Sequence, residues 1–144
     1  MHDVSSSEAF TGSAHLHAPH GSVAATIRDA ERLPLWNPAL SRVSAPDHSG
    51  VSTVTVHHVL RGRLGITVVD PSVLAMTVTV PGLTEQSTWQ VDHCTDPGCP
   101  LPCTVVHHTL HQRGPLADLI GPREIRRLPD LRLARLARHL RAPR

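Results

Sequence analysis

The chain has 144 residues, of which 40% are hydrophobic, and a net charge of +2 at pH 7. This length suffices for one domain with one buried core. No segment approaches the roughly 18 apolar residues of a membrane span, and the Ser-rich N-terminus lacks the apolar run of a signal peptide. The small net charge argues against nucleic acid as the main partner. We expect a cytoplasmic protein with a flexible leader over residues 1–13 and a single domain over residues 14–144.

Two missing residue types restrict the chemistry that this chain can perform. All 14 of its Lys and Arg residues are Arg, and it has no Tyr. A Schiff base on a side-chain amine is therefore excluded, and no phenol is present to act as an acid. Proton transfer would have to use His, Asp, Glu, Cys, Ser, Thr or water. With one Phe and two Trp, any cavity would be lined mostly by aliphatic side chains and His.

The first elements are bounded by prolines. The pattern predicts, in order, a strand over residues 14–18, a helix over residues 20–30 and a short helix over Glu31–Trp36. Pro19 cannot donate to a strand ladder and suits a helix start. Val23 and Ile27 then share one helical face. Pro38 stops the second helix.

The middle of the chain changes to a period of two, which is typical of strands. Six Val- and Thr-rich segments follow one another: Leu40–Ala45, Val51–Leu60, Leu64–Val69, Val73–Val80, Glu85–Val91 and Thr104–His111. Turn signals separate most of them, at Arg61-Gly62, Asp70-Pro71, Pro81-Gly82 and Asp96-Pro97-Gly98. Together with residues 14–18 they predict an antiparallel meander of seven strands.

From Leu116 the pattern becomes helical again. Four apolar residues recur at i, i+3, i+4 and i+7, namely Leu133, Leu136, Ala137 and Leu140. Arg132, Arg135 and Arg138 fall on other faces. Pro129 cannot donate inside a continuous helix, so a kink or break is expected there.

The opening of the chain resembles that of the polyketide cyclase/START-like superfamily. The resemblance rests on an apolar strand ending in Ala18-Pro19, an amphipathic helix, and then Leu33-Pro34-Leu35-Trp36-Asn37-Pro38. The exit from the last strand, Arg113-Gly114-Pro115-Leu116, is also similar, so the resemblance spans about residues 14–141. It implies an α+β helix-grip fold, in which a curved seven-stranded antiparallel sheet wraps around a long C-terminal helix. Two short helices would lie between the first two strands, and a cavity between sheet and helix.

Strand alternation selects the side chains that would line this cavity. The side chains that the patterns direct toward the inside of the fold predict a nonpolar pocket, bounded by Val56, Met76, Val78, Trp89, Val106 and Leu136. Trp36 is a candidate for the cavity entrance, with a packing anchor as the alternative. Four charged residues near strand ends could orient a polar ligand group or simply face solvent: Arg61, Arg63, Asp70 and Glu85.

The same alternation directs His58 and His108 inward, which makes them the candidate catalytic residues. An imidazole can take and give a proton, as cyclisation and dehydration require. The alternative for each is a buried neutral His bonded to backbone or water. The opposite alternation puts other histidines on the outer face, where they could bind a metal adventitiously or form an ordinary polar surface: His15, His17, His57, His107 and His111.

The segment Asp92–Cys103 holds every cysteine of the chain. Cys94, Cys99 and Cys103 with His93 could close on zinc, although the spacing matches no known zinc motif. A disulfide between Cys94 and Cys103, or an ordinary Pro-rich loop, are the alternatives. We assign no metal ligands and no cofactor from the sequence.

Three functions fit these features. The first is a cyclase or dehydratase of secondary metabolism that folds a polyketide-like substrate in the cavity while a His moves protons. The second is a noncatalytic binding or transport protein for a lipid or another hydrophobic ligand. The third is an accessory factor that uses its basic C-terminal helix to meet an acidic partner. An acyl carrier protein and a second copy of the chain are candidate partners.

Overall fold

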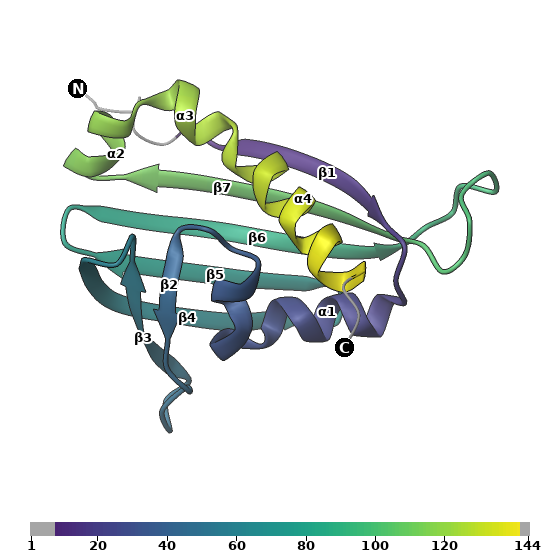
Figure 1. Cartoon of the computed structure of the whole chain (residues 1–144), viewed down its shortest axis with the longest axis horizontal. Coiled ribbons are helices and arrows are strands. Elements are labelled where there is room, and N and C mark those ends of the chain that lie inside the picture. Colours follow the sequence, from purple (N-terminus) through teal and green to yellow (C-terminus); the bar gives the residue numbers. More distant parts are fainter. Residues whose placement is uncertain (1–7, 142–144) are drawn as a thin grey trace.

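The computed structural model describes residues 8–141. Its elements follow the predicted order (Figure 1). Two short helices come after the first strand, and a meander of strands and then the C-terminal helices follow them. The strands are β1 (Phe10–Leu16), β2 (Leu40–Val43), β3 (Val51–Val56), β4 (Leu60–Asp70), β5 (Val73–Val80), β6 (Leu83–His93) and β7 (Thr104–Arg113). The helices are α1 (His20–Arg28), the 3-10 helix η2 (Ala30–Leu35), α2 (Pro115–Ile120), α3 (Pro122–Arg126) and α4 (Leu128–Arg141).

The seven strands form one antiparallel sheet in the order β1-β7-β6-β5-β4-β3-β2. Consecutive strands are neighbours from β2 to β7, and β1 joins the far edge by pairing with β7. Figure 1 shows the sheet curving and α4 crossing one face of it. The architecture confirms the predicted α+β helix-grip fold. Within residues 8–141, every helix is too short or too polar to cross a membrane.

Two of the boundaries that differ from the sequence prediction bear on the extent of the domain and on the site. β1 begins at Phe10, so residues 10–13 belong to the domain and not to the expected leader, whose residues 1–7 lie outside the described part. β3 ends at Val56 and not at Leu60, because His57 and His58 take positive φ values of 50° and 67° and turn the chain into β4. A strand cannot continue through left-handed residues, so the predicted alternation stops before them.

The predicted break near Pro129 is present. α3 ends at Arg126 and α4 begins at Leu128, which puts Pro129 in the first turn of α4. Pro is tolerated there because the first-turn N–H groups have no partner within the helix.

The main core fills the space between the sheet, α1, η2 and α4. Trp36 and Trp89 meet edge to face, with ring centroids 5.3 Å apart. Both indoles are almost fully buried, as are Val106 and Leu136. Large aromatic side chains of this kind supply much of the burial energy of a small domain. Trp36 is therefore a packing anchor, which was the alternative to its expected role at a cavity entrance.

A turn after β7 positions α2 over the start of β6. Gly114 has a φ of 110°, and a Cβ there would lie 2.5 Å from the carbonyl oxygen of Gly82. Only glycine fits this left-handed, close approach. Pro115 then begins α2, and the N–H of Leu116 donates to the Gly82 oxygen at 3.0 Å. The exit signal Arg113-Gly114-Pro115-Leu116 thus builds one wall of the site described next.

Candidate ligand cavity

A cavity of about 490 Å³ opens between the sheet and the helices α2, α3 and α4. Its walls are mostly aliphatic. The sheet contributes Leu40, Val56, Leu60, Met76, Val78 and Leu83, and the helices contribute Leu116, Leu119, Ile120, Leu128 and Leu131. Leu119, Ile120 and Leu131 are also exposed to solvent, so part of the rim of the cavity is apolar. Cavities of this size and lining are typical of sites for small hydrophobic molecules.

Three of the six predicted boundary residues, Val56, Met76 and Val78, line this cavity. Trp89, Val106 and Leu136 do not, although each faces the core as the strand and helix patterns predicted. The difference arises because the two indoles and the His108 ring fill the middle of the inner face. Alternation tells which side a residue faces, and it does not tell whether the space beyond it is filled.

A buried ion pair forms the polar part of the cavity wall. The Arg132 guanidinium donates to both carboxylate oxygens of Glu85, each at 2.8 Å. Gln112 donates from Nε2 to Glu85 Oε1 at 2.7 Å. All three side chains line the cavity and are buried. Because the pair is bidentate and the carboxylate has a third donor, its burial is compensated.

This arrangement sets the charge of Glu85. Burial alone would raise the pKa of this carboxyl, but the positive charge and hydrogen bonds of Arg132, with the Gln112 bond, hold the pKa below its usual value. Glu85 is therefore ionised at neutral pH. An ionised carboxylate accepts hydrogen bonds only, which fixes the Gln112 amide with its nitrogen toward Glu85. The Gln112 Oε1 and the Arg132 Nε are buried and find no partner among the described residues.

His108 lies behind the ion pair and does not line the cavity. Its ring stacks on Trp89, with centroids 3.5 Å apart. Nε2 is 3.3 Å from Arg132 and Nδ1 is 3.1 Å from the carbonyl oxygen of Thr88. Since the guanidinium can only donate, Nε2 accepts and Nδ1 carries the proton that is donated to Thr88.

The surroundings keep this imidazole neutral. Burial, together with the positive charge of Arg132, lowers the pKa of His108 to about 3. An imidazole with such a pKa is a poor proton donor at neutral pH. This geometry matches the alternative given above, a buried neutral His bonded to backbone, and His108 positions Arg132.

His58 does not face the cavity, which contradicts the predicted inward direction. It is exposed in the β3–β4 turn, where its N–H donates to Ser41 Oγ at 2.7 Å. The neighbouring His57, predicted for the outer face, lines the cavity instead. The exchange follows from the turn that ends β3 four residues early.

The sequence pattern did not indicate the ion pair. It put Arg132 on a helix face other than the apolar one, and it offered Glu85 as a residue near a strand end that could orient a polar ligand group or face solvent. A signal was present, because Glu85 has the same alternation as the inward Ser87 and Trp89. Gln112 likewise has the alternation of His108 and Leu110. The other charged candidates are exposed, as their alternative predicted: Arg61, Arg63 and Asp70.

The chain matches one family model, described as polyketide cyclase / dehydrase and lipid transport, over residues 7–141. No curated protein sequence matches it closely enough to count as a relative.

Solved structures with the same fold cover 92% of the chain. An uncharacterised protein from Bacillus thuringiensis has a TM-score of 0.70 at 15% identity over 98% of its length. A START superfamily protein from Mycobacterium smegmatis has a TM-score of 0.69 at 11% identity over 93% of its length. The di-domain ARO/CYC protein BexL, from the BE-7585A biosynthetic pathway, has a TM-score of 0.65 at 16% identity over 46% of its length. Identities this low establish the fold and leave the function to the site.

Proposed function

Since the chain belongs to the polyketide cyclase/dehydrase and lipid transport family, we propose that it binds a hydrophobic small molecule in the cavity under α2 and α3. The observation that carries the proposal is the cavity itself, about 490 Å³ of space with aliphatic walls and one polar wall. An empty apolar space of this size costs packing energy, which a bound ligand would recover.

The polar wall indicates the chemistry of the ligand. The negative charge of Glu85 and the positive charge of Arg132 already neutralise each other, so this buried pair has no net charge to offer an ion. Gln112 Oε1 lacks a donor and Arg132 Nε lacks an acceptor. After a small movement of these two side chains toward the cavity, a hydroxyl group could donate to the first and accept from the second. The ligand we propose is a neutral, largely apolar molecule with a hydroxyl or enol group at one end.

The binding test uses a naphthol as probe and isothermal titration calorimetry as readout. Wild-type protein should bind the naphthol saturably with one site. The corresponding methyl ether cannot donate to Gln112, and loss of one hydrogen bond should weaken binding by about tenfold. Equal affinity of naphthol and ether would remove the hydroxyl requirement, and no saturable binding of either would remove the proposed function.

A cavity-filling variant tests the location. Val78 lines the cavity, whereas Val59 is 75% exposed in the β3–β4 turn. Val78→Trp should lower naphthol affinity more than about tenfold because the indole occupies the ligand volume. Val59→Trp adds the same side chain outside the cavity and should leave affinity unchanged. Circular dichroism checks that both variants are folded.

A cyclase or dehydratase activity is the second candidate, and His57 is the observation that favours it. It is the imidazole that lines the cavity, and an imidazole can move protons while apolar walls orient a flexible substrate. His58 and His108 were the sequence-based candidates for this role, and neither lines the cavity. Secondary metabolism, a cytoplasmic location, an acyl carrier protein partner and a homodimer stay predictions.

A further inference from the structure

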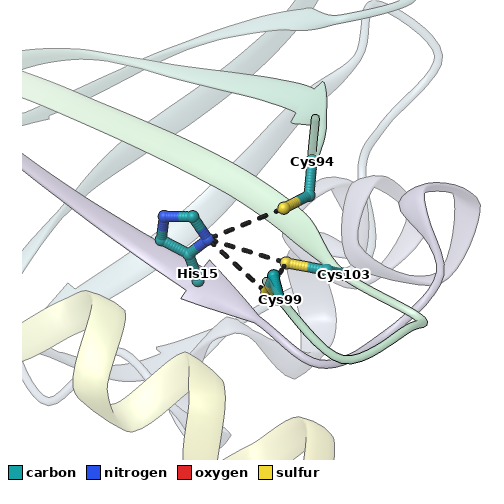
Figure 2. A group of neighbouring side chains, drawn as sticks. All are labelled: His15, Cys94, Cys99 and Cys103. Carbon is teal, nitrogen blue, oxygen red and sulfur yellow. Dashed lines mark hydrogen bonds between the residues drawn. The ribbon is translucent and has the colours of Figure 1, made fainter. Parts of the chain in front are cut away.

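Four potential metal ligands meet at the opposite end of the sheet from the cavity. They are His15 on β1, Cys94 just after β6, and Cys99 and Cys103 in the loop before β7 (Figure 2). Figure 1 shows this loop at the end of the molecule away from α2 and α3. Cys94, just past the end of β6, is nine positions after the cavity residue Glu85, which corresponds to about 30 Å of extended strand.

Strand pairing explains why residues so far apart in sequence converge. β7 lies between β1 and β6 in the sheet. Leu16 on β1 and His93 on β6 both pair with Thr104, the first residue of β7. The residues next to these three positions are His15, Cys94 and Cys103. The register of the sheet thus gathers them at one corner, and Cys94 N donates to Cys103 O at 3.3 Å to close the loop base.

The fourth ligand comes from a loop with a defined conformation. Cys99 N donates to the carbonyl oxygen of Asp96 at 3.1 Å, and Gly98 N donates to the Asp96 side chain at 2.9 Å. Three prolines within residues 97–102 further limit the conformations of the unfolded loop. The loop therefore holds Cys99 over the corner formed by the strands.

The distances between the His15 nitrogen and the three sulfurs suit a tetrahedrally coordinated metal ion. His15 Nδ1 is 3.8 Å from the sulfurs of Cys94 and Cys99 and 3.6 Å from that of Cys103. All four ligand atoms lie within 4.8 Å of one another. Zinc bonds of about 2.3 Å to sulfur and about 2.0 Å to nitrogen give tetrahedral edges of about 3.5 Å (N to S) and about 3.8 Å (S to S). The three N-to-S distances lie within about 0.3 Å of the N-to-S edge.

The sulfurs would have to move to reach tetrahedral geometry. Cys99 Sγ and Cys103 Sγ are 2.6 Å apart, about 1 Å closer than a tetrahedral edge. Rotation of the Cys99 side chain, which is only half-buried, would relieve this close contact. The same closeness makes a Cys99–Cys103 disulfide the competing outcome, and the two outcomes differ in their thiol count and metal content.

We propose that His15, Cys94, Cys99 and Cys103 form a structural zinc site that fastens the edge strand β1 and the β6–β7 loop to β7. Three thiolates and one imidazole select zinc among common divalent ions. Four protein ligands leave no open position for a substrate, so the ion stabilises the fold and does not catalyse. The sequence suggested His93 as the histidine ligand beside the three cysteines. In the structure His15 takes this place, and the His93 ring stacks on that of His20, with the ring centroids 4.4 Å apart.

The experiment measures metal binding to the full chain, purified under reducing conditions, stripped with a chelator and titrated with Co²⁺ and then Zn²⁺. We expect one equivalent of Co²⁺ with the absorption bands of tetrahedral thiolate coordination, displaced by one equivalent of Zn²⁺. Thermal unfolding of the zinc form should occur at a higher temperature than that of the stripped form. The proposal would be overturned if the protein has three free thiols and binds no metal. It would also be overturned if the protein has one free thiol and no metal, because two of the cysteines would then form a disulfide.

A matched pair of variants tests the ligand set. His15→Asn should weaken Zn²⁺ binding by more than about 100-fold. Loss of a residue that only hydrogen-bonds to a metal ligand already lowers metal affinity by up to about 100-fold, and His15 is proposed as a ligand itself. His93→Asn, in the same loop region, should bind zinc as the wild type does. Cys99→Ser changes a loop residue outside the sheet and should also lose tetrahedral cobalt absorption while the protein stays folded by circular dichroism. Loss of zinc in His93→Asn with retention in His15→Asn would contradict the proposed ligands.

Discussion

The two halves of the inner sheet face differ in how they are filled. Near α1 and η2, the space is occupied by Trp36, Trp89 and the stacked ring of His108. Near α2 and α3, the facing side chains are aliphatic and leave about 490 Å³ open. The Glu85–Arg132 pair lines the open half, and Arg132 reaches back to His108 in the filled half. One sheet thus carries a rigid core and a binding cavity, with a buried polar network between them.

The difference indicates where binding energy and folding energy come from. In the filled half, every large side chain is packed, which stabilises the domain. In the open half, apolar surface remains available for a ligand. The polar network has to be fixed by both halves, because a buried charge without its partner is very costly.

The largest expected effect comes from breaking the ion pair. Arg132→Met would leave the Glu85 carboxylate buried without its countercharge and should lower the free energy of unfolding by about 3–5 kcal/mol. Urea denaturation measures the loss. The control Arg135→Met, on the exposed side of α4, should change stability by less than about 0.5 kcal/mol.

The double variant Glu85→Leu/Arg132→Met sharpens this result. It removes both charges, and an apolar pair in their place should restore much of the stability lost in the single variant. A single-variant loss no larger than that of Arg135→Met would show that the polar network does not link the two halves.

The second effect is a pH dependence due to His108. Its folded pKa of about 3 lies below its ordinary value of 6.5, so the unfolded chain binds a proton that the folded chain does not between these values. Stability due to the neutral imidazole is therefore fully present above pH 6.5 and is lost as the pH falls toward 3, by up to about 1.4 kcal/mol per pH unit. Below about pH 4.5, protonation of Glu85, whose pKa is lowered in the fold, adds to the loss.

The variant His108→Gln isolates this contribution. Its unfolding free energy should fall less steeply than that of the wild type between pH 6.5 and 4.5, where Glu85 contributes little. Identical slopes for the two proteins in this window would mean that His108 is not held neutral by the filled half.

The smallest effect on stability, and the sharpest on function, is expected in the β3–β4 turn. His57→Asn and His58→Asn both keep a residue that tolerates positive φ, so both should unfold within about 0.5 kcal/mol of the wild type. Because His57 lines the cavity and His58 does not, His57→Asn should change naphthol affinity and His58→Asn should not. The same pair separates the two histidines in any turnover assay, and an effect confined to His58→Asn would reverse the assignment.

The sequence predicted the fold well and the site in part. Strand periodicity and the Leu-Pro-x-Trp-Asn-Pro corner indicated the meander and its order, because both depend on local pattern. Val56, Met76 and Val78 were correctly directed toward the cavity for the same reason. Periodicity could not show that β3 turns at His57, since two consecutive left-handed residues without glycine have no sequence signature.

Contacts between distant elements were harder to predict. Arg132 lies on α4 and Glu85 on β6, and only the docking of the helix brings them together. His15 and the cysteines likewise meet only through the register of β1, β7 and β6. The Cys spacing alone favoured His93, which is nearer in sequence.

The most direct test of the central claim, a cavity in one half of the sheet face and solid core in the other, is a methyl NMR titration with the naphthol. Methyl groups of Met76, Val78 and Leu116 should shift saturably with one affinity, while those of Val106 and Leu136 should not respond. Saturable shifts at Val106 and Leu136 without shifts at Met76 and Val78 would contradict the account, because they would put the ligand in the half that the two tryptophans fill.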